Sequence, residues 1–599
     1  MTLVHAQPRT APAHRPPARP HRLRRVAAAA IALVLGASGL LAAAVPATAT
    51  APTPSPVVTS PNGRGNVVLN LFQWTWDSVA AECTSTIGPA GFGYVQVSPP
   101  QEHIQGASWW TSYQPVSYRI ESKLGTRAEF QAMVATCRTA GVGVIADAVI
   151  NHTTGADLGS GTGVAGSSFG VDSFPGIYGA ADFNDCRTNI ASYQDRYQVQ
   201  NCRLSSLQDL RTGSEHVRST LAAYLNDLLS LGVAGFRIDA AKHIPAADLA
   251  AIKSQLTNPN VYWVQEVIGA SGEPVQETEY VGTGDVHEFD YARTLKSTFD
   301  GQIKNLASIS NGLLPSAQAG VFVDNHDTER NGETMNYQWG AKYVLANAFM
   351  LSYPYGSPSV YSGYRFTSTD AGAPGATATT VPDASCTSGQ WTCTQRWTEI
   401  AGMVGFHNTV EGTAVTNWWD DGANHIAYGR GAKGYVTINN SASAVTRTYQ
   451  SSLPAGTYCD VVAATDCSHA YTVSASGTFT ATVPAYGALA LHIGKTTSGG
   501  GTTQGDASFN VTATTVWGQN VYVVGNVAAL GSWAPASAVP LSSATYPVWR
   551  GTVDLPAGST FEYKYLKKDG SGNVVWESGA NRTATVGTDG SVTLNDTWH

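Results

Sequence analysis

Short apolar segments alternate with helix-like stretches from about residue 66 to 400, and this alternation constrains the fold more than any other feature of the chain. Between two of the segments, apolar residues recur at the spacing of one helix face, and Gly232 is placed to end that helix. The recurring residues are Val217, Leu221, Leu225 and Leu228. Such alternation predicts parallel strands joined by crossover helices, and the length of about 330 residues favours a closed (β/α)8 barrel. The predicted strands are 67–72, 93–97, 142–150, 233–238, 261–268 and 321–323.

An open doubly wound sheet is the alternative α/β architecture. In such a sheet a GxGxxG motif often opens a helix after a strand, and this sequence has none in that position. The closed barrel therefore remains the favoured interpretation, with a catalytic barrel expected at 66–403.

The barrel region is interrupted once and is followed by segments of different composition. Residues 151–206 are rich in Gly, Ser, Asp and Asn and are too long for a plain loop, so we expect a small inserted domain there. Beyond the barrel the helical period disappears, and strand-like runs predict an antiparallel β domain at 404–494. A Gly/Thr linker at 495–505 leads to residues 506–599, whose alternating pattern predicts a β-sandwich.

The first 49 residues have the pattern of an export signal. A basic stretch ends at Arg24 and Arg25, an uncharged Ala/Leu/Val run covers 26–45, and small residues follow it. An uncleaved membrane anchor is the alternative, but the run is mostly Ala and no charged stop follows it. We therefore predict a signal peptide at 1–49 and secretion by the Sec or the Tat route. No other segment of the sequence has the composition of a membrane span, so no membrane association is expected.

The charge balance bears on the possible partners, and the cysteine count bears on disulfide formation. Without the first 50 residues the chain holds 29 Lys and Arg against 43 Asp and Glu, so nucleic acid is not an expected partner. All eight cysteines follow the export segment, and an even count in an exported chain predicts disulfides rather than a metal cluster. The grouping along the chain favours Cys186 with Cys202, Cys386 with Cys393 and Cys459 with Cys467, which leaves Cys83 with Cys137.

Acidic residues stand at the carboxyl ends of four predicted strands. They are Asp147 in DAVINH, Asp239 in GFRIDAAKH, Glu266 in VQEVI and Asp327 in FVDNHD. In a parallel barrel these ends form the face on which active sites lie. Arg237 and Asp239 are two residues apart and so face the same side of their strand. One such acid alone would most often be a solvated surface residue, but four on four strands make that explanation improbable.

Clustered carboxylates beside Arg and His suit the cleavage of a glycosidic bond. One acid must stay protonated to donate to the leaving oxygen, while another stays ionised to attack the anomeric carbon. Arg237 beside Asp239 favours the ionised form, so Asp239 is the predicted nucleophile and Glu266 the predicted proton donor. The 15 Trp and 26 Tyr residues agree with a sugar ligand, which stacks on flat apolar faces.

In order and spacing, DAVINH, GFRIDAAKH, EVI and FVDNHD resemble the four signature regions of the α-amylase family of glycoside hydrolases. With QVSPP, WWTSYQPVSY and FMLSYPYG, the resemblance is closest to animal-type α-amylases and their bacterial relatives, over about residues 66 to 494. It implies that Asp239 is the nucleophile, Glu266 the general acid/base, and Asp327 the acid that binds sugar hydroxyls and supports substrate distortion. The residues that it places in the substrate subsites are Trp109, Trp110, Tyr113, Gln114, His152, Arg237, Lys242, His243 and His326.

The same resemblance implies a structural Ca²⁺ ion between the inserted domain and the barrel. The matching ligands are the side chains of Asn151, Asp209 and His243 and a backbone carbonyl from about Gln200. An Asn, an Asp and a carbonyl supply the hard oxygen ligands that Ca²⁺ prefers, although a His is less usual.

Chloride is not expected as a cofactor, although some animal-type relatives are activated by this anion. Arg237 and Asn325 match two of the anion's ligands in those enzymes, but Ser359 stands where they have a second Arg. A neutral hydroxyl cannot replace the attraction of a cation for the anion, so the remaining site should bind chloride weakly.

The last segment resembles the starch-binding domain appended to fungal glucoamylases and some bacterial amylases. The resemblance rests on TATTVWGQNVYVVGNVAALGSW, FEYKYLKKDGSGNVVWESGANRT and the terminal DTW. It implies one sugar site at Trp533, Lys564, Trp576, Glu577 and Asn581 and a second site at Trp517 and Tyr546. Trp549 has a matching residue type, but its place in a predicted strand favours a core position.

The sequence therefore predicts a secreted, monomeric α-amylase that acts on starch and maltooligosaccharides. It would hydrolyse internal α-1,4-glucosidic bonds with retention, through a covalent glycosyl-enzyme intermediate. An exo-acting maltooligosaccharide-forming amylase or a cyclodextrin-forming glucanotransferase is the alternative within the enzyme class, and a non-catalytic starch-binding protein is the alternative outside it. The intact Asp239, Glu266 and Asp327 argue against the non-catalytic alternative.

Overall fold

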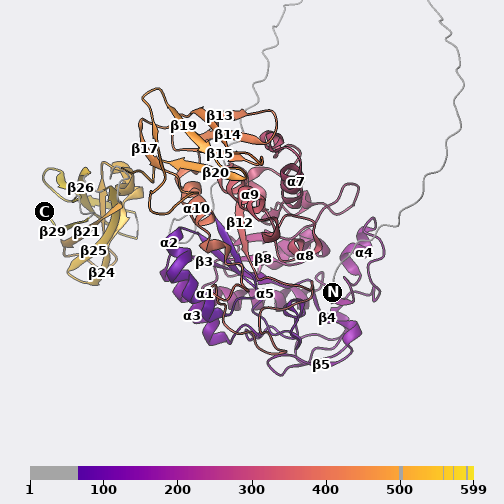
Figure 1. Ribbon diagram of the computed structural model, residues 1–599. Coiled ribbons are helices and arrows are strands. Elements are labelled where there is room, and N and C mark those ends of the chain that lie inside the picture. The colour runs from indigo at the N-terminus through magenta and orange to yellow at the C-terminus, as the bar shows by residue number, and fades with distance from the viewer. Residues whose placement is uncertain (1–64, 498–503, 557–558, 571, 588–590) are drawn as a thin grey trace, which may run out of the picture.

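The computed structural model describes residues 65–497, 504–556, 559–570, 572–587 and 591–599. The predicted signal peptide lies outside these residues, as do positions 498–503 of the predicted linker. Figure 1 shows a barrel with its helices in the lower part of the view, a β domain above it and a small sandwich at the left.

Eight parallel strands close into a barrel in the order β1-β12-β11-β10-β9-β8-β3-β2, which confirms the predicted fold class. Six strands overlap the predicted runs. The other two, β10 and β12, were not predicted, because β10 has only three residues and β12 has three Ser and a Pro among its six residues. The strands are β1 Val68–Leu71, β2 Tyr94–Val97, β3 Gly143–Ala148, β8 Gly235–Ile238, β9 Tyr262–Gln265, β10 Asp285–His287, β11 Ala319–Phe322 and β12 Ser357–Ser362.

Helices follow most of the strands and cover the barrel (Figure 1). The helix with the predicted apolar spacing is α5, Glu215–Ser230, and its four predicted core residues are buried. The other helices of the barrel are α1 Trp76–Glu82, α2 Gly88–Ala90, α3 Arg127–Thr139, α6 Ala246–Ser254, α7 Phe289–Asp300, α8 Thr328–Asn331, α9 Ala341–Ser352 and α10 Thr398–Val410.

The inserted segment leaves the barrel after β3 and returns through a two-stranded sheet. Strand β4, His152–Gly155, pairs in antiparallel fashion with β7, Leu207–Asp209. Between them lie the short strands β5, Gly161–Thr162, and β6, Ser168–Phe169, and the helix α4, Arg196–Asn201. The pairing of β4 with β7 brings Asp209 opposite His152, at the junction with the barrel.

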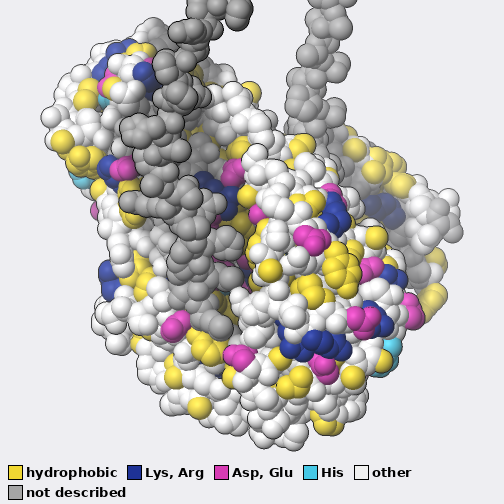
Figure 2. Space-filling view, turned by 90° about the vertical axis from the view of Figure 1, so that its right-hand side faces the viewer, with side chains coloured by type: hydrophobic (Ala, Val, Ile, Leu, Met, Phe, Trp, Pro, Cys, Tyr) yellow, Lys and Arg dark blue, Asp and Glu magenta, His cyan; other side chains and the backbone are white. Residues whose placement is uncertain are grey.

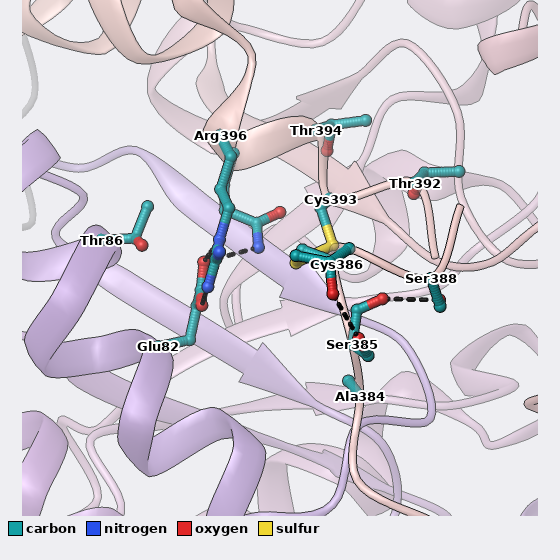
Figure 3. The surroundings of a disulfide bond; sticks show 12 residues. Glu82, Thr86, Ala384, Ser385, Cys386, Ser388, Thr392, Cys393, Thr394 and Arg396 are labelled. Atoms are coloured by element: carbon teal, nitrogen blue, oxygen red, sulfur yellow. Dashed lines mark hydrogen bonds and ion pairs between the residues drawn. A yellow bond between two sulfur atoms is a disulfide. The ribbon is translucent and has the colours of Figure 1, made fainter. Parts of the chain in front are cut away.

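All four predicted disulfides form: Cys83–Cys137, Cys186–Cys202, Cys386–Cys393 and Cys459–Cys467. Figure 3 shows the third bond in the loop after β12, next to the ion pair between Glu82 of α1 and Arg396. The two oppositely charged groups lie 2.5 Å apart and join that loop to the first helix of the barrel.

The β domain shares its core with the barrel. Its main sheet has the order β13-β14-β15-β20, with strands Val415–Asp420, His425–Arg430, Gly434–Asn439 and Gly487–His492. One face of this sheet belongs to the same hydrophobic cluster as α9 and α10. The opposite face covers a second cluster with β16 Val445–Gln450, β17 Gly456–Cys459, β18 Ala470–Val473 and β19 Thr478–Val483.

The C-terminal sandwich has a hydrophobic core of its own. Its sheets are β24-β25-β21-β29 and β23-β22-β26-β27, with β28 paired to β26. Trp549 is buried in this core, and its indole N–H donates to the Ala513 carbonyl oxygen at 3.1 Å, as the strand position predicted. The strands are β21 Gln504–Thr512, β22 Asn520–Gly525, β23 Val539–Pro540, β24 Ser542–Thr545, β25 Val548–Pro556, β26 Thr560–Lys568, β27 Val574–Trp576, β28 Arg582–Thr585 and β29 Ser591–Thr597.

The surface mixes charges of both signs. On the face seen in Figure 2, Lys and Arg side chains alternate with Asp and Glu among uncharged groups. Within the described ranges, no helix has both the length and the apolar character needed to cross a membrane.

Candidate active site

Three neighbouring strands bring carboxyl groups to one guanidinium. Arg237, near the end of β8, lies 2.8 Å from Asp147 Oδ1, 2.6 Å from Asp239 Oδ1 and 3.0 Å from Glu266 Oε1. The strand register explains this, because Asp147 of β3 pairs with Arg237, while Glu266 directly follows β9. Tyr113 donates from its hydroxyl to Asp147 Oδ2 at 2.9 Å, and the Ala240 N–H donates to Glu266 Oε2 at 2.8 Å.

Burial raises the pKa of all three carboxyl groups. The pKa of Asp147 rises to about 7 through burial; Arg237 lowers it and Asp239 raises it. Burial also raises the pKa values of Asp239 and Glu266, and Arg237 opposes both rises. One positive charge cannot offset three negative charges in a buried site, so the site disfavours the state in which all three carboxyl groups are ionised. Arg237 contacts both Asp239 and Glu266, so proximity to this cation alone does not distinguish their roles.

Asp327 and His326 come from the turn after β11. His326 Nε2 lies 3.4 Å from Asp327 Oδ2, and the Asp327 side chain is 40% exposed, so its carboxylate faces open space. The His326 ring stacks between Phe72 and Tyr113, with centroid separations of 4.9 and 5.0 Å. Burial lowers the pKa of His326 well below its usual value, so the imidazole is neutral at neutral pH.

The predicted aromatic residues gather beside this turn. Trp109 meets the rings of Tyr113 and His326 edge-on at 5.8 and 5.6 Å, and its indole N–H donates to the Thr369 carbonyl oxygen at 2.8 Å. Trp110 is partly buried against the barrel core, and its indole nitrogen has no hydrogen-bond partner within the described part of the chain.

Other predicted subsite residues join the inserted segment to the barrel. His152 Nε2 contacts the Tyr113 carbonyl oxygen at 3.0 Å, and burial lowers the pKa of His152 to about 4. Gln114 accepts a hydrogen bond from the Gly155 N–H at 2.9 Å. Lys242 is buried, donates from Nζ to the Ile268 carbonyl oxygen and lies 2.5 Å from Glu273 Oε2, so its charge is already paired.

The structure adds a residue that sequence reasoning missed. Arg330 of α8 donates from Nη1 to the His326 carbonyl oxygen at 2.6 Å and pairs with Glu329, whose Oε1 also accepts from the Tyr361 hydroxyl at 2.7 Å. Four aromatic rings enclose the guanidinium at 4.5 to 5.4 Å from their centroids. They belong to Phe72, Trp109, Tyr364 and Phe366. The Arg330 guanidinium therefore contacts both the backbone of His326 and the ring of Trp109.

The predicted calcium ligands lie where the inserted segment meets the barrel. Asp209 is buried, and burial raises its pKa to about 7, while hydrogen bonds from Asn184 and Asn151 and the positive charge of Arg187 oppose the rise. No Lys or Arg of the described residues forms an ion pair with it. His243 Nδ1 contacts the Val199 carbonyl oxygen at 2.8 Å, which brings α4, and with it Gln200, against this junction. A buried carboxyl group that has no ion-pair partner in contact, beside amide and carbonyl oxygens, fits a hard cation such as Ca²⁺.

The donor set is rich in neutral oxygens rather than in acids. Accordingly, among the described residues no three His, Cys, Asp or Glu side chains are grouped as a metal cluster.

The sandwich places two of its predicted sugar-binding aromatics side by side. The rings of Trp533 and Trp576 are 6.5 Å apart at their centroids, and Trp576 is 41% exposed. Lys564 donates to the Gly579 carbonyl oxygen at 2.7 Å, and Asn581 donates to Glu562 at 3.0 Å. Trp517 and Tyr546 of the second predicted site are exposed on loops.

Glu577 does not present its carboxylate to this surface. Its side chain is 1% exposed and pairs with Arg582 at 2.9 Å, and one of its oxygens accepts from the Tyr565 N–H. Glu577 therefore orders the strand beside Lys564 instead of offering a free oxygen to a sugar.

Known proteins resemble this chain over most of its length. The descriptions "Alpha amylase, C-terminal all-beta domain" and "Starch binding domain" match residues 416–494 and 506–596. An α-amylase of Streptomyces violaceus is 55% identical over 587 residues, which cover 96% of this chain and 99% of that protein. An α-amylase of Thermomonospora curvata is 46% identical, over 91% of this chain and 94% of that protein. The crystal structure of α-amylase I from Eisenia fetida matches with a TM-score of 0.68 and 37% identity, over 71% of this chain and 97% of that one.

Proposed function

Because this chain belongs to the α-amylase family of glycoside hydrolases, we propose that it hydrolyses internal α-1,4-glucosidic bonds of starch with retention of configuration. The observation that supports this proposal most directly is the convergence of Asp147, Asp239 and Glu266 on Arg237, with Asp327 nearby, at the carboxyl ends of the barrel strands. Two carboxyl groups in different electrostatic environments are what a retaining glycosidase requires.

The local charges favour Asp239 as the nucleophile and Glu266 as the acid. Repulsion from both Asp239 and Asp327 raises the pKa of Glu266, in addition to burial. For Asp239 the like-charge contribution comes from Asp327, and the hydrogen bond from Arg237 at 2.6 Å stabilises the ionised form. Glu266 is therefore the group that more readily keeps a proton.

The reaction then proceeds in two steps. First, an oxygen of Asp239 bonds to the anomeric carbon while the bond to the leaving glucan breaks, and Glu266 gives its proton to the leaving oxygen. Next, the Glu266 carboxylate removes a proton from water, the water oxygen bonds to the anomeric carbon, and the bond to Asp239 breaks. Two inversions give net retention.

The remaining residues bind and orient the sugar. We assign Asp327 and the neutral His326 and His152 to the hydroxyl groups of the sugar that reacts, and Trp109, Trp110 and Tyr113 to stacking around it. Gln114, Lys242 and His243 complete the proposed subsites. Arg237 stabilises the ionised carboxylates by its positive charge. Ser359 is uncharged and stands where chloride-activated relatives have a second Arg, so we propose a reaction that does not require chloride.

A structural Ca²⁺ ion is part of the proposal. Asn151, Asp209, His243 and the Gln200 carbonyl would hold it, and its chemistry would be to join oxygens of the inserted segment and the barrel. The chain itself already joins them through the contact between His243 and Val199.

The proposed division follows the changes of composition along the chain. We propose a catalytic barrel at 66–403 with an insertion at 151–206, a β domain at 404–494, a linker at 495–505 and a starch-binding domain at 506–599. In the last, Trp533, Trp576, Lys564 and Asn581 would form one sugar site, ordered by Glu577, and Trp517 and Tyr546 a second. We also propose that 1–49 is a signal peptide and that the secreted enzyme acts as a monomer.

Isosteric substitution of the two proposed catalytic acids tests this function. We expect Asp239→Asn and Glu266→Gln to lower turnover of soluble starch by several orders of magnitude and to leave the melting temperature within a few degrees. Asp285→Asn is the control, because this acid begins β10 at the opposite end of the barrel. Near-normal hydrolysis by either catalytic variant would refute the assignment.

A further inference from the structure

A cavity of about 380 Å³ lies between the barrel and the β domain, and it shares no lining residue with the candidate active site. Its walls come from the first turns of α9 and α10, from the turn after β17, from β18 and from the connection between β19 and β20. Figure 1 shows α9 and α10 directly beside β20, where these walls meet. The volume is in the range of sites for small ligands.

Tyr486 lines this cavity, and its backbone has an unfavourable conformation. Tyr486 is 40% exposed and has φ of 49°, in the left-handed region that bulky residues avoid. The turn is fixed by the Tyr486 N–H, which donates to the Ser441 carbonyl oxygen at 3.0 Å. A glycine would adopt this conformation freely, so the fold gives no reason for a tyrosine here. Strain of this kind, retained at the edge of a cavity, suggests that the ring binds a ligand.

Several polar side chains in the cavity have hydrogen-bonding groups that the described residues do not use, although the Tyr471 ring packs against Phe479. Glu399 is partly buried in the first turn of α10, and Tyr471 is partly buried on β18. In the part of the chain that the structure describes, the side chains of Glu399, Tyr471, His469 and Tyr486 form neither hydrogen bonds nor ion pairs. Donors and acceptors from three separate segments are therefore free to bind one ligand.

The floor of the cavity, in contrast, is fixed. Asp460 is buried and accepts hydrogen bonds from the N–H groups of Val462 and Ala490, both at 3.1 Å. These bonds tie the turn after β17 to β20, so the cavity does not depend on movement of a loop.

The chemistry of these walls favours a neutral, hydroxyl-rich ligand. Two carboxyl groups, Glu399 and Asp460, would repel an anion. A metal ion would find too few acids, because Asp460 is already bound by backbone N–H groups. Aromatic faces with carboxylate, imidazole and phenol groups around them are the surroundings that sugars require. We infer that this cavity is a second carbohydrate site on the catalytic unit, which binds the end or a turn of an α-1,4-glucan chain.

The inference rests on the proposed function, because it assumes that the substrate is a glucan. Helices α9 and α10 belong to the same hydrophobic cluster as the barrel, so a glucan bound here is held at a fixed position relative to the cleft. A second contact with the same polymer raises the effective concentration of its other segments at the active site.

The test counts maltoheptaose molecules bound to the full chain. The parent variant has Glu266→Gln, which removes turnover, and Trp517→Ala, Trp533→Ala, Tyr546→Ala and Trp576→Ala, which silence the sandwich. Calorimetric titration should give two molecules per chain, one in the cleft and one in the cavity. Tyr486→Gly should remove one of them, and its φ of 49° suits glycine, so the fold should be kept. Tyr486→Phe, which keeps the ring, should retain both.

The outcomes separate this inference from the proposed function. One bound molecule that Tyr486→Gly does not affect would overturn the cavity site and leave the cleft assignment intact. One bound molecule that Tyr486→Gly abolishes would support the cavity site and overturn the cleft. Two bound molecules in both the parent variant and Tyr486→Gly would also refute the inference. Thermal melting of Tyr486→Gly, expected within a few degrees of the parent, confirms that any loss of binding is local.

Discussion

If Glu266 is the acid, as we propose, its protonation state sets the alkaline limit of catalysis. Glu266 must hold a proton to act as the acid, so activity falls as pH rises through its pKa. Burial raises this pKa, Arg237 lowers it, and the negative charges of Asp239 and Asp327 raise it further. Removing one of those negative charges must therefore lower the pKa.

Asp327→Asn removes one of them. We expect this variant to lose at least about tenfold in turnover, and the alkaline limb of its kcat/KM to move to lower pH. A pH profile on a maltooligosaccharide measures both effects. Asp300→Asn, at an exposed position on α7, is the control and should leave the profile unchanged. An alkaline limb at unchanged or higher pH in Asp327→Asn would contradict the electrostatic account.

Arg330 positions His326 and Trp109 from behind the proposed sugar site. Arg330→Lys keeps the charge but loses the flat guanidinium that the four rings enclose. We expect kcat/KM on maltooligosaccharides to fall on the order of tenfold, equivalent to about 1.4 kcal/mol, with part of the loss in KM because Trp109 is a proposed sugar-stacking residue. Arg365→Lys provides the comparison, because Arg365 also covers an aromatic ring, that of Tyr337, but is exposed. Equal kinetics for Arg330→Lys and wild type would show that the enclosure has no catalytic effect.

The acids at the strand ends could be predicted from the sequence, whereas the shortest strand and the contacts between distant segments could not. The four acids could be predicted, because strand alternation and strand ends depend only on neighbouring residues. Strand β10 could not, since three residues give no period. The aromatic enclosure of Arg330 also escaped prediction, because its rings come from positions 72, 109, 364 and 366, which only the closed barrel brings together. Glu577 turns inward because Arg582 lies beside it across a turn, and no sequence period indicates that.

The junction between β4, β7 and α4 should be the part of the fold that is most sensitive to calcium. If Ca²⁺ binds at Asp209, free Ca²⁺ at 100 times its Kd adds about 2.7 kcal/mol to the free energy of unfolding. We expect a chelator to lower the melting temperature of the wild type, and Asp209→Asn to abolish most of that difference. Asp172→Asn is the matched control, since Asp172 already pairs with Arg187. A chelator effect of equal size in Asp209→Asn would place the ion elsewhere.

The hydrophobic core of the sandwich is separate from that of the barrel, which predicts a catalytic unit and a binding unit that fold independently. The barrel and the β domain share one hydrophobic cluster, while the sandwich has its own. A chain that ends at residue 497 should therefore fold and hydrolyse soluble starch within about twofold of the full chain, because the sandwich raises local substrate concentration without changing the barrier. Its adsorption to raw starch granules should fall strongly. Depletion of enzyme from solution by granules measures this.

Substitution of Trp533→Ala with Trp576→Ala in the full chain should reproduce much of that loss. These two rings lie side by side, with Trp576 exposed and Trp533 partly buried. If the truncated chain adsorbs as well as the full chain, granule binding belongs to the barrel or the β domain.

In the proposed mechanism, Asp239 attacks the anomeric carbon and Glu266 serves first as acid and then as base. This double displacement requires that the new reducing end keep the α configuration. Proton NMR of the first products from a maltooligosaccharide, recorded before mutarotation, measures the anomer directly. The account predicts initial release of the α anomer. Initial release of the β anomer would mean a single displacement by water and would contradict the role of Asp239.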